Sequence, residues 1–325
     1  MFTVKDCIDE LNEKNCFDSQ FKVSEIGQIL EKAIKIKLNK ESVLSKITNF
    51  FVSFYTVIHY EKVFYETQSG YARTLKTPII DELKDKVVPK KLITKDFQMI
   101  DLWDINPCNS NKYIIFCEGI SSEKSLVNQQ NAYLQMIQNG YGVAAFNYRG
   151  RGFSSKEFSQ QGAFLDVCAV YDYLRSKNIQ PYNIGIIGHS MGTGVACDFS
   201  SKKYTAFTLL INPFTKASDM AKNITEKLNM PEIIKKTIKN FPSKFIPLKN
   251  VFDNEKTLKS INSPVFIIHN TDDKTIPVSQ ARTLFQKIKN KGSVFYKELP
   301  GDDHEINREK IHLGLSLLKR HVCMP

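Results

Sequence analysis

Residues 188–192 have the sequence Gly-His-Ser-Met-Gly, which fits the pattern Gly-x-Ser-x-Gly. The apolar run 184–187 before them is typical of a buried strand, and the residues from Met191 onward have a helical pattern. On a sharp turn between strand and helix, a serine hydroxyl projects from the tip of a sheet, and the two glycines leave room where strand and helix pack closely. Ser190 is therefore the candidate nucleophile. The alternative is a glycine-rich turn in which this serine only caps the helix.

A serine hydroxyl needs a general base within hydrogen-bond reach and a carboxylate that orients this base. Residues 267–277 read as a strand that ends in a loop with Asp272 and Asp273, and residues 299–305 as a strand that ends in a loop with His304. Both loops place polar groups beyond the carboxyl end of a strand, where Ser190 also lies. These residues leave the acid open between the two aspartates.

Alternating strands and helices must position these side chains. A strand hairpin is expected at residues 91–94 and 98–103. The further strands expected are residues 113–117, 142–148, 184–187, 207–211, 265–269 and 294–299, and the helices 126–139, 162–177, 280–289 and 308–321. This alternation predicts the α/β class, with a mostly parallel central sheet and helices on both faces.

Two segments fall outside this alternation. Residues 1–88 look helical and are predicted to form an N-terminal helical extension, with the sheet domain at 89–325. The extension's aromatic face, around residues 50–54, would pack on the main domain or contact a membrane surface or an acyl chain. Residues 215–262 interrupt the alternation after the strand at 207–211. We expect this insert to form a helical lid above the carboxyl edge of the sheet.

These motifs resemble those of the α/β-hydrolase superfamily, of the esterase, monoglyceride-lipase and serine-aminopeptidase-like kind. Residues 269–277 are similar to the acid segment of these enzymes, and this match assigns the acid to Asp273, with Asp272 as the second choice. The family's Gly-x-x-His pattern falls on Gly301 to His304, and residues 146–154 resemble its Asp-x-Arg-Gly-x-Gly-x-Ser loop. The resemblance extends from about residue 90 to the C-terminus and does not include residues 1–88.

Two backbone N–H groups are expected to hold the oxyanion. Met191 lies at the start of the helix after Ser190, where the helix dipole also favours negative charge. The resemblance implies Ile120 N–H as the second donor. In the family a histidine usually precedes the glycine of that loop, and this chain has Glu118 there. A carboxylate close to a developing oxyanion would oppose catalysis unless it points away or is paired.

Composition narrows the functional classes. The 325 residues carry a formal net charge of +11, and residues 215–262 hold ten lysines against five acidic residues. Such a segment favours anionic surfaces, or it forms a solvated lysine face. No nucleic-acid-binding module accompanies the charge, so we expect no nucleic-acid partner. Seven scattered cysteines without a Cys-x-x-Cys pair indicate reduced thiols and no zinc site. No secretory signal or membrane-spanning stretch is recognisable, which favours a cytoplasmic location.

The sequence thus predicts a serine hydrolase that cleaves an acyl ester or thioester and needs no metal or organic cofactor. Its partner would be a small-molecule acyl substrate, with a lipid-like or lysophospholipid substrate favoured, and with transient contact to an anionic membrane surface. Two alternatives remain. One is a serine peptidase of the aminopeptidase-like kind. The other is a hydrolase-shaped binding protein with weak activity, because of Glu118.

Overall fold

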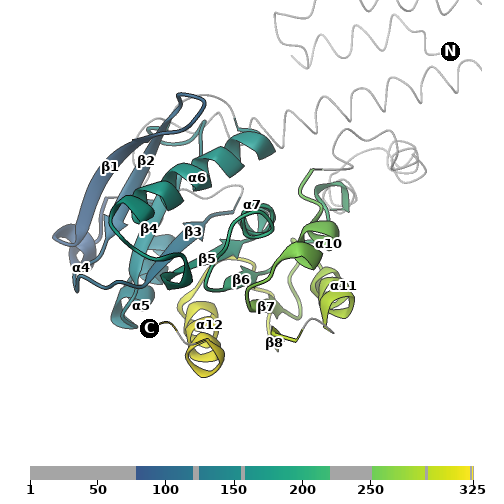
Figure 1. Cartoon of the computed structure of the whole chain (residues 1–325). Helices are drawn as coiled ribbons and strands as arrows, with labels where there is room; N and C mark the ends of the chain where they lie inside the picture. The colour runs from purple at the N-terminus through teal and green to yellow at the C-terminus, as the bar shows by residue number, and fades with distance from the viewer. Residues whose placement is uncertain are drawn as a thin grey trace, which may run out of the picture. The chain divides into compact units, whose positions relative to one another are not determined.

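A computed structural model describes residues 78–119, 124–154, 158–219, 251–289, 292–322 and 324. These residues build an eight-stranded sheet with the strand order β1-β2-β4-β3-β5-β6-β7-β8 (Figure 1). The strands are β1 (Val87–Ile93), β2 (Met99–Ile105), β3 (Tyr113–Cys117), β4 (Gly142–Asn147), β5 (Ile184–His189), β6 (Thr208–Ile211), β7 (Val265–Asn270) and β8 (Val294–Leu299). β2 runs antiparallel to both β1 and β4, and all the other neighbouring strands pair in parallel. The mostly parallel sheet predicted from the sequence is confirmed.

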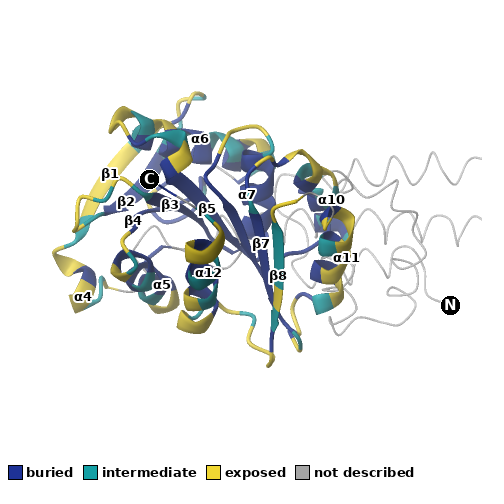
Figure 2. Ribbon diagram, turned by 60° about the horizontal axis from the view of Figure 1, so that its bottom comes forward, coloured by how far each residue is buried: buried dark blue, intermediate teal, exposed yellow. Residues whose placement is uncertain are grey.

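Helices cover both faces of the sheet. Those in the described ranges are α4 (Asp81–Lys84), α5 (Val127–Gln138), α6 (Gln160–Ser176), α7 (Met191–Ser200), α10 (Asn254–Thr257), α11 (Val278–Ile288) and α12 (Arg308–His321), with short 3₁₀ turns at η1 (Pro181–Asn183) and η4 (Leu258–Ser260). α5 and α12 pack on one face, and α6, α7 and α11 pack on the other (Figure 1). α5, α6, α11 and α12 have a buried side and an exposed side, whereas α7 is buried along its whole length (Figure 2).

The central strands are apolar on both faces because both faces are covered. In β3, Ile114 and Phe116 belong to the core under α5 and α12, whereas Ile115 and Cys117 belong to the core under α6 and α7. Side chains alternate between the two faces along a strand, so one short apolar run contributes residues to both hydrophobic cores. The parallel pairing also brings the carboxyl ends of β3, β4, β5, β6, β7 and β8 to one edge of the sheet.

The predicted hairpin is present, with longer strands than the sequence indicated. β1 pairs with β2 from Val87 opposite Ile105 to Ile93 opposite Met99. In the turn between them, Thr94 N–H donates to the Gln98 carbonyl oxygen at 2.9 Å, and Phe97 has φ 60°. β1 is mostly exposed and forms one edge of the sheet (Figure 2).

Two predicted segments lie largely outside the described residues. Of the predicted extension 1–88, the structure describes residues 78–88, and β1 begins at Val87, two residues before the predicted boundary. Of the predicted lid 215–262, it describes residues 215–219 and 251–262. Both assignments stay predictions. Within the ranges that are described, no helix is long and apolar enough to cross a bilayer.

Candidate active site

Ser190 joins β5 to α7 in a backbone conformation that L-residues rarely adopt, with φ 53° and ψ −121°. A Cβ at Gly188 would lie 2.5 Å from the Gly192 carbonyl oxygen, and a Cβ at Gly192 would collide with the Cys117 carbonyl oxygen. Only glycine allows backbones to approach this closely. Ser190 N–H donates to the Ile211 carbonyl oxygen of β6 at 3.0 Å, which fixes the turn at the carboxyl edge of the sheet.

The two other predicted residues meet Ser190 at this edge. The Nε2 atom of His304, in the loop after β8, lies 3.0 Å from Ser190 Oγ. Its Nδ1 atom lies 2.7 Å from Oδ2 of Asp273, in the loop after β7. The neighbouring Asp272 is exposed and instead accepts hydrogen bonds from Thr271 Oγ1 and Gly301 N–H. Of the two aspartates, Asp273 is the one that contacts His304.

The Asp273 carboxylate is buried and fully engaged. Its Oδ1 accepts the backbone N–H groups of Thr275 at 2.7 Å and Ile276 at 2.9 Å, and its Oδ2 also accepts from Asn212 Nδ2 at 2.8 Å. Burial raises the pKa of this carboxyl, but the hydrogen bond and charge of His304 and the two N–H groups outweigh burial and bring the pKa below its usual value. An ionised carboxylate can orient the imidazole and stabilise its protonated form.

Three residues that the sequence did not assign to the site hold the loop around His304. Asn212, directly after β6, donates from Nδ2 to the His304 carbonyl oxygen at 3.1 Å. His189 places Nε2 2.8 Å from the same oxygen. Lys310 on α12 is fully buried and donates from Nζ to the carbonyl oxygens of Asp303, at 2.6 Å, and Glu305. Only Asn212 could have been found from the sequence, and only by its position. It directly follows an apolar strand, as the loops that carry Asp273 and His304 do.

His189 is buried beside His304. The rings of the two histidines have centroids 5.3 Å apart. Burial, reinforced by the charge of His304, lowers the pKa of His189 to about 3. The imidazole is therefore neutral near pH 7 and donates one N–H to the His304 backbone.

The Glu118 carboxylate is paired. Tyr133 on α5 donates its hydroxyl to Glu118 Oε1 at 2.6 Å, and the glutamate is 2% exposed. Arg151 Nη1 donates to the Gly119 carbonyl oxygen at 2.9 Å. These bonds hold the end of the strand and direct the carboxylate toward α5. Ile120, the second predicted oxyanion donor, lies outside the described residues.

Arg149, in the loop after β4, belongs to a separate ion-pair cluster. Its guanidinium lies 2.7 Å from an Asp96 oxygen and 2.8 Å from an Asp166 oxygen, and its side chain is 5% exposed. Arg149 N–H also donates to Asp166 Oδ2 at 2.9 Å. The arginine thus ties the β1–β2 turn to α6 and supports the loop rather than presenting a free cation.

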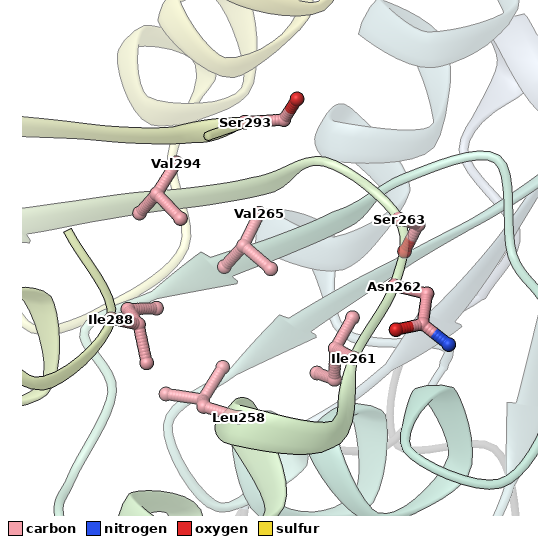
Figure 3. Close-up of a pocket in the computed structure, with 8 residues that line it drawn as sticks. All are labelled: Leu258, Ile261, Asn262, Ser263, Val265, Ile288, Ser293 and Val294. Atoms are coloured by element: carbon pink, nitrogen blue, oxygen red, sulfur yellow. The ribbon is translucent and has the colours of Figure 1, made fainter. Parts of the chain in front are cut away.

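A cavity of about 220 Å³ lies at the other end of the strands (Figure 3). Its lining includes Val265 and Val294, the first residues of β7 and β8, and the aliphatic side chains of Leu258, Ile261 and Ile288. A six-residue strand spans about 20 Å, so this cavity is remote from the loops that carry Asp273 and His304. It is not the space into which Ser190 projects.

An eight-stranded, mostly parallel sheet with a serine on a strained turn between strand and helix defines an α/β hydrolase. The chain belongs to the prolyl oligopeptidase family, whose model matches residues 128–317. This confirms the predicted superfamily.

Several known proteins are similar to this chain. The protein ABHD12B of Homo sapiens is 24% identical over 190 residues, which are 56% of this chain and 51% of that protein. The lysophosphatidylserine lipase ABHD12 of Macaca fascicularis is 27% identical over 186 residues, 54% of this chain and 45% of the lipase. The chain thus spans about half the length of these relatives. A solved esterase of Pyrococcus furiosus has a TM-score of 0.59 at 21% identity, with 77% of this chain and 98% of the esterase covered, which shows the fold.

Proposed function

We propose that the protein is a serine hydrolase that cleaves a carboxylic ester or thioester through Ser190, His304 and Asp273. The observation that carries this proposal is the chain of hydrogen bonds from Ser190 Oγ to His304 Nε2, at 3.0 Å, and from His304 Nδ1 to Asp273 Oδ2, at 2.7 Å. Nucleophile, base and orienting acid lie within the reach that acyl transfer requires.

In this proposal the Ser190 oxygen attacks the acyl carbon while His304 Nε2 accepts the hydroxyl proton. The tetrahedral intermediate expels the alcohol or thiol, which takes that proton from His304, and an acyl-serine ester remains. A water molecule then attacks the acyl carbon while His304 Nε2 accepts its proton. The bond between Ser190 Oγ and the acyl carbon breaks, Oγ takes the proton from His304, and the carboxylic acid leaves. Asp273 stays ionised throughout and keeps the imidazole in the tautomer that accepts at Nε2.

The oxyanion would be held by backbone N–H groups of Met191 and Ile120. Met191 is the first residue of α7, at the positive end of the helix dipole. The position of Ile120 follows from the family pattern. The hydrogen bond from Tyr133 to Glu118 supports this arrangement, because a carboxylate held toward α5 is not free to turn toward a developing oxyanion.

We infer a lipid-like acyl substrate, with a lysophospholipid favoured. One support is the lysophosphatidylserine lipase among the relatives, at 27% identity. The other is the sequence of the insert 215–262, which combines apolar residues such as Ile233 and Phe241 with lysines such as Lys235 and Lys236. Apolar side chains would receive an acyl chain, and the lysines would meet a phosphate headgroup or an anionic membrane surface.

A second candidate is peptide hydrolysis, favoured by the prolyl oligopeptidase family model. The same Ser190, His304 and Asp273 would act on an amide carbonyl. Esters and amides differ in the leaving group, so the triad alone does not separate the two reactions.

A fluorophosphonate probe tests the nucleophile. Such a probe forms a covalent bond only with an activated serine, so the wild-type protein should be labelled and the Ser190→Ala variant should not. Hydrolysis of a short p-nitrophenyl ester should fall by about 10⁴–10⁶-fold in the same variant. Labelling of the variant, or ester hydrolysis within tenfold of wild type, would remove Ser190 as nucleophile.

A further inference from the structure

Asn212 has two unfavourable features. Its φ is 49°, in the left-handed region that residues other than glycine rarely adopt, although asparagine adopts it more readily than most. Its Oδ1 atom is buried without a hydrogen-bond partner among the described residues. A buried polar atom without a partner has lost its hydrogen bonds to water and gained none in return. Both features are unfavourable for stability, so this residue is a candidate for a functional role.

Three acceptors surround its Nδ2 atom and settle which way the amide faces. They are Oδ2 of Asp273 at 2.8 Å, the carbonyl oxygen of His304 at 3.1 Å, and the carbonyl oxygen of Asp303 at 3.5 Å. The reverse orientation would set the amide oxygen against a carboxylate and two carbonyls, which is repulsive. The site therefore requires a donor at this place.

The two shorter bonds join the acid to the base. Asp273 and His304 come from separate loops, after β7 and β8, and their side chains share one hydrogen bond. Asn212 adds a second link, because one amide group donates both to the carboxylate oxygen that holds the imidazole and to the backbone of the imidazole's own residue. Its backbone is in turn tied to β7, with Asn212 N–H 2.8 Å from the Ile268 carbonyl oxygen.

We infer that Asn212 is a positioning residue, which fixes the acid loop and the histidine loop at the separation that proton transfer from Ser190 requires. The inference rests on the proposed serine-hydrolase function. A displacement of about 1 Å at a catalytic constellation can cost up to 10²-fold in rate. Loss of the amide should therefore lower kcat and leave KM nearly unchanged, since Asn212 need not touch the substrate.

The first test removes the amide and keeps the backbone conformation. The Asn212→Gly variant allows a positive φ, and Asn178→Gly is the matched control, since Asn178 has φ 64° and is exposed at the end of α6. Relative to the control, kcat for a p-nitrophenyl ester should fall by about 10- to 100-fold per folded molecule, with KM within twofold. The folded fraction is taken from circular dichroism.

The second test exchanges the donor for an acceptor of the same shape. In Asn212→Asp the new carboxylate would lie against Asp273. The other titratable residues around it are His304 and Asp303 in the loop after β8, His189 on β5, His269 on β7 and Lys310 on α12. Burial and the like charge should raise its pKa, so it protonates as the pH falls and then donates as the amide does.

The ratio of kcat in Asn212→Asp to kcat in wild type should therefore rise by about fivefold or more between pH 8 and pH 6. A purely structural residue would not produce this rise once activity is normalised to the folded fraction. A flat ratio, or an Asn212→Gly enzyme with kcat within twofold of the Asn178→Gly enzyme, overturns the inference. If Asn212→Gly does not fold, the pH ratio decides.

The Ser190→Ala variant, measured in the same assay, distinguishes a failure of the proposed function from a failure of the positioning role of Asn212. If that variant keeps its activity, the proposed function fails whatever Asn212 does. If it is inactive while the Asn212 variants behave as wild type, only the positioning role fails.

Discussion

Two buried polar clusters lie at the carboxyl edge of the same sheet, about 10 Å apart by strand spacing, with β3 between them. After β4, Arg149 is held between the carboxylates of Asp96 and Asp166, so one cation is shared by two carboxylates. After β5 to β8, the Asp273 carboxylate is surrounded instead by two backbone N–H groups, the Asn212 amide and the His304 imidazole.

The difference decides what each cluster can do. Arg149 lowers the pKa of Asp96 well below its usual value, whereas burial raises the pKa of Asp166 to about 6, so both carboxyls are mostly ionised at pH 7 beside a guanidinium that keeps its proton. At the other cluster, His304 is the group that can gain a proton, and the carboxylate beside it stabilises the protonated form. An arginine between two carboxylates holds elements of the fold together, whereas an imidazole between a carboxylate and a serine hydroxyl can transfer a proton. The predictions below test this division.

After Ser190→Ala, the largest effect is expected at the acid. Asp273→Asn should lower kcat for ester hydrolysis by about 10⁴-fold, because an amide no longer stabilises the imidazolium and can hold the ring in the wrong tautomer. Asp272→Asn is the matched control, because its exposed carboxylate bonds Thr271 and Gly301 instead. Steady-state kinetics of both variants check this. A larger loss in Asp272→Asn would move the acid by one residue.

The second effect should appear in stability. Arg149→Met leaves the fully buried Asp166 without its cation, and breaking such a pair costs about 3–5 kcal/mol in the free energy of unfolding. Urea unfolding measures this loss, while kcat per folded molecule should stay close to wild type. Arg282→Met, which removes an exposed pair with Glu298, is the control and should lose far less. A fall in kcat without a change in unfolding would contradict the division between the clusters.

The sequence predicted the parts of the site that local patterns encode. Ser190 lies in a five-residue motif, and His304 follows a strand and a glycine, so each has a signal among its immediate neighbours. Asn212 has only its place directly after an apolar strand, because its role depends on contacts with residues 61 and 92 positions away. Those contacts arise from the pairing of β6 between β5 and β7, with Ile211 opposite both His189 and Ile268.

The same distinction holds for the fold. Apolar runs that alternate with helical patterns predicted the sheet and its helices, because a strand that is covered on both faces is apolar along its whole length. The partner of Glu118 was not predictable in this way. Tyr133 is on α5, and only the packing of that helix against β3 brings its hydroxyl to the carboxylate.

A smaller effect is expected from pH, and its sign follows from His189. Burial lowers the pKa of this histidine to about 3, whereas the unfolded chain takes up a proton near pH 6.5. Below about pH 6.5 the unfolded state therefore binds the extra proton, and the free energy of unfolding falls as the pH drops toward 3. One such group contributes a slope of about 1.4 kcal/mol per pH unit.

Replacing His189 by glutamine should remove that part of the slope and keep a donor for the His304 carbonyl oxygen. Urea unfolding at intervals between pH 4 and pH 7 measures the slope. His312→Gln, at an exposed position on α12, is the control. The free energy of unfolding of His189→Gln could instead fall with pH as steeply as that of wild type. The uptake of a proton by His189 on unfolding would then not contribute to the acid sensitivity of the protein.

The smallest effect, counted for each CH₂ group added to the acyl chain, concerns the choice of substrate. Neither cluster explains this choice. The predicted lid 215–262 carries apolar residues, among them Ile224, Leu228 and Met230, in excess of what docking one helical layer needs. If some line an acyl pocket, kcat/KM for p-nitrophenyl esters should rise by about fourfold per added CH₂, which corresponds to about 0.8 kcal/mol, until the pocket is full. Replacing two of the three by serine should flatten the series without changing the rate on the acetate ester, because the chemistry belongs to Ser190, His304 and Asp273. A series that is flat in the wild-type enzyme, together with faster cleavage of a peptide amide than of any ester, would replace the lipid-directed proposal by the peptidase one.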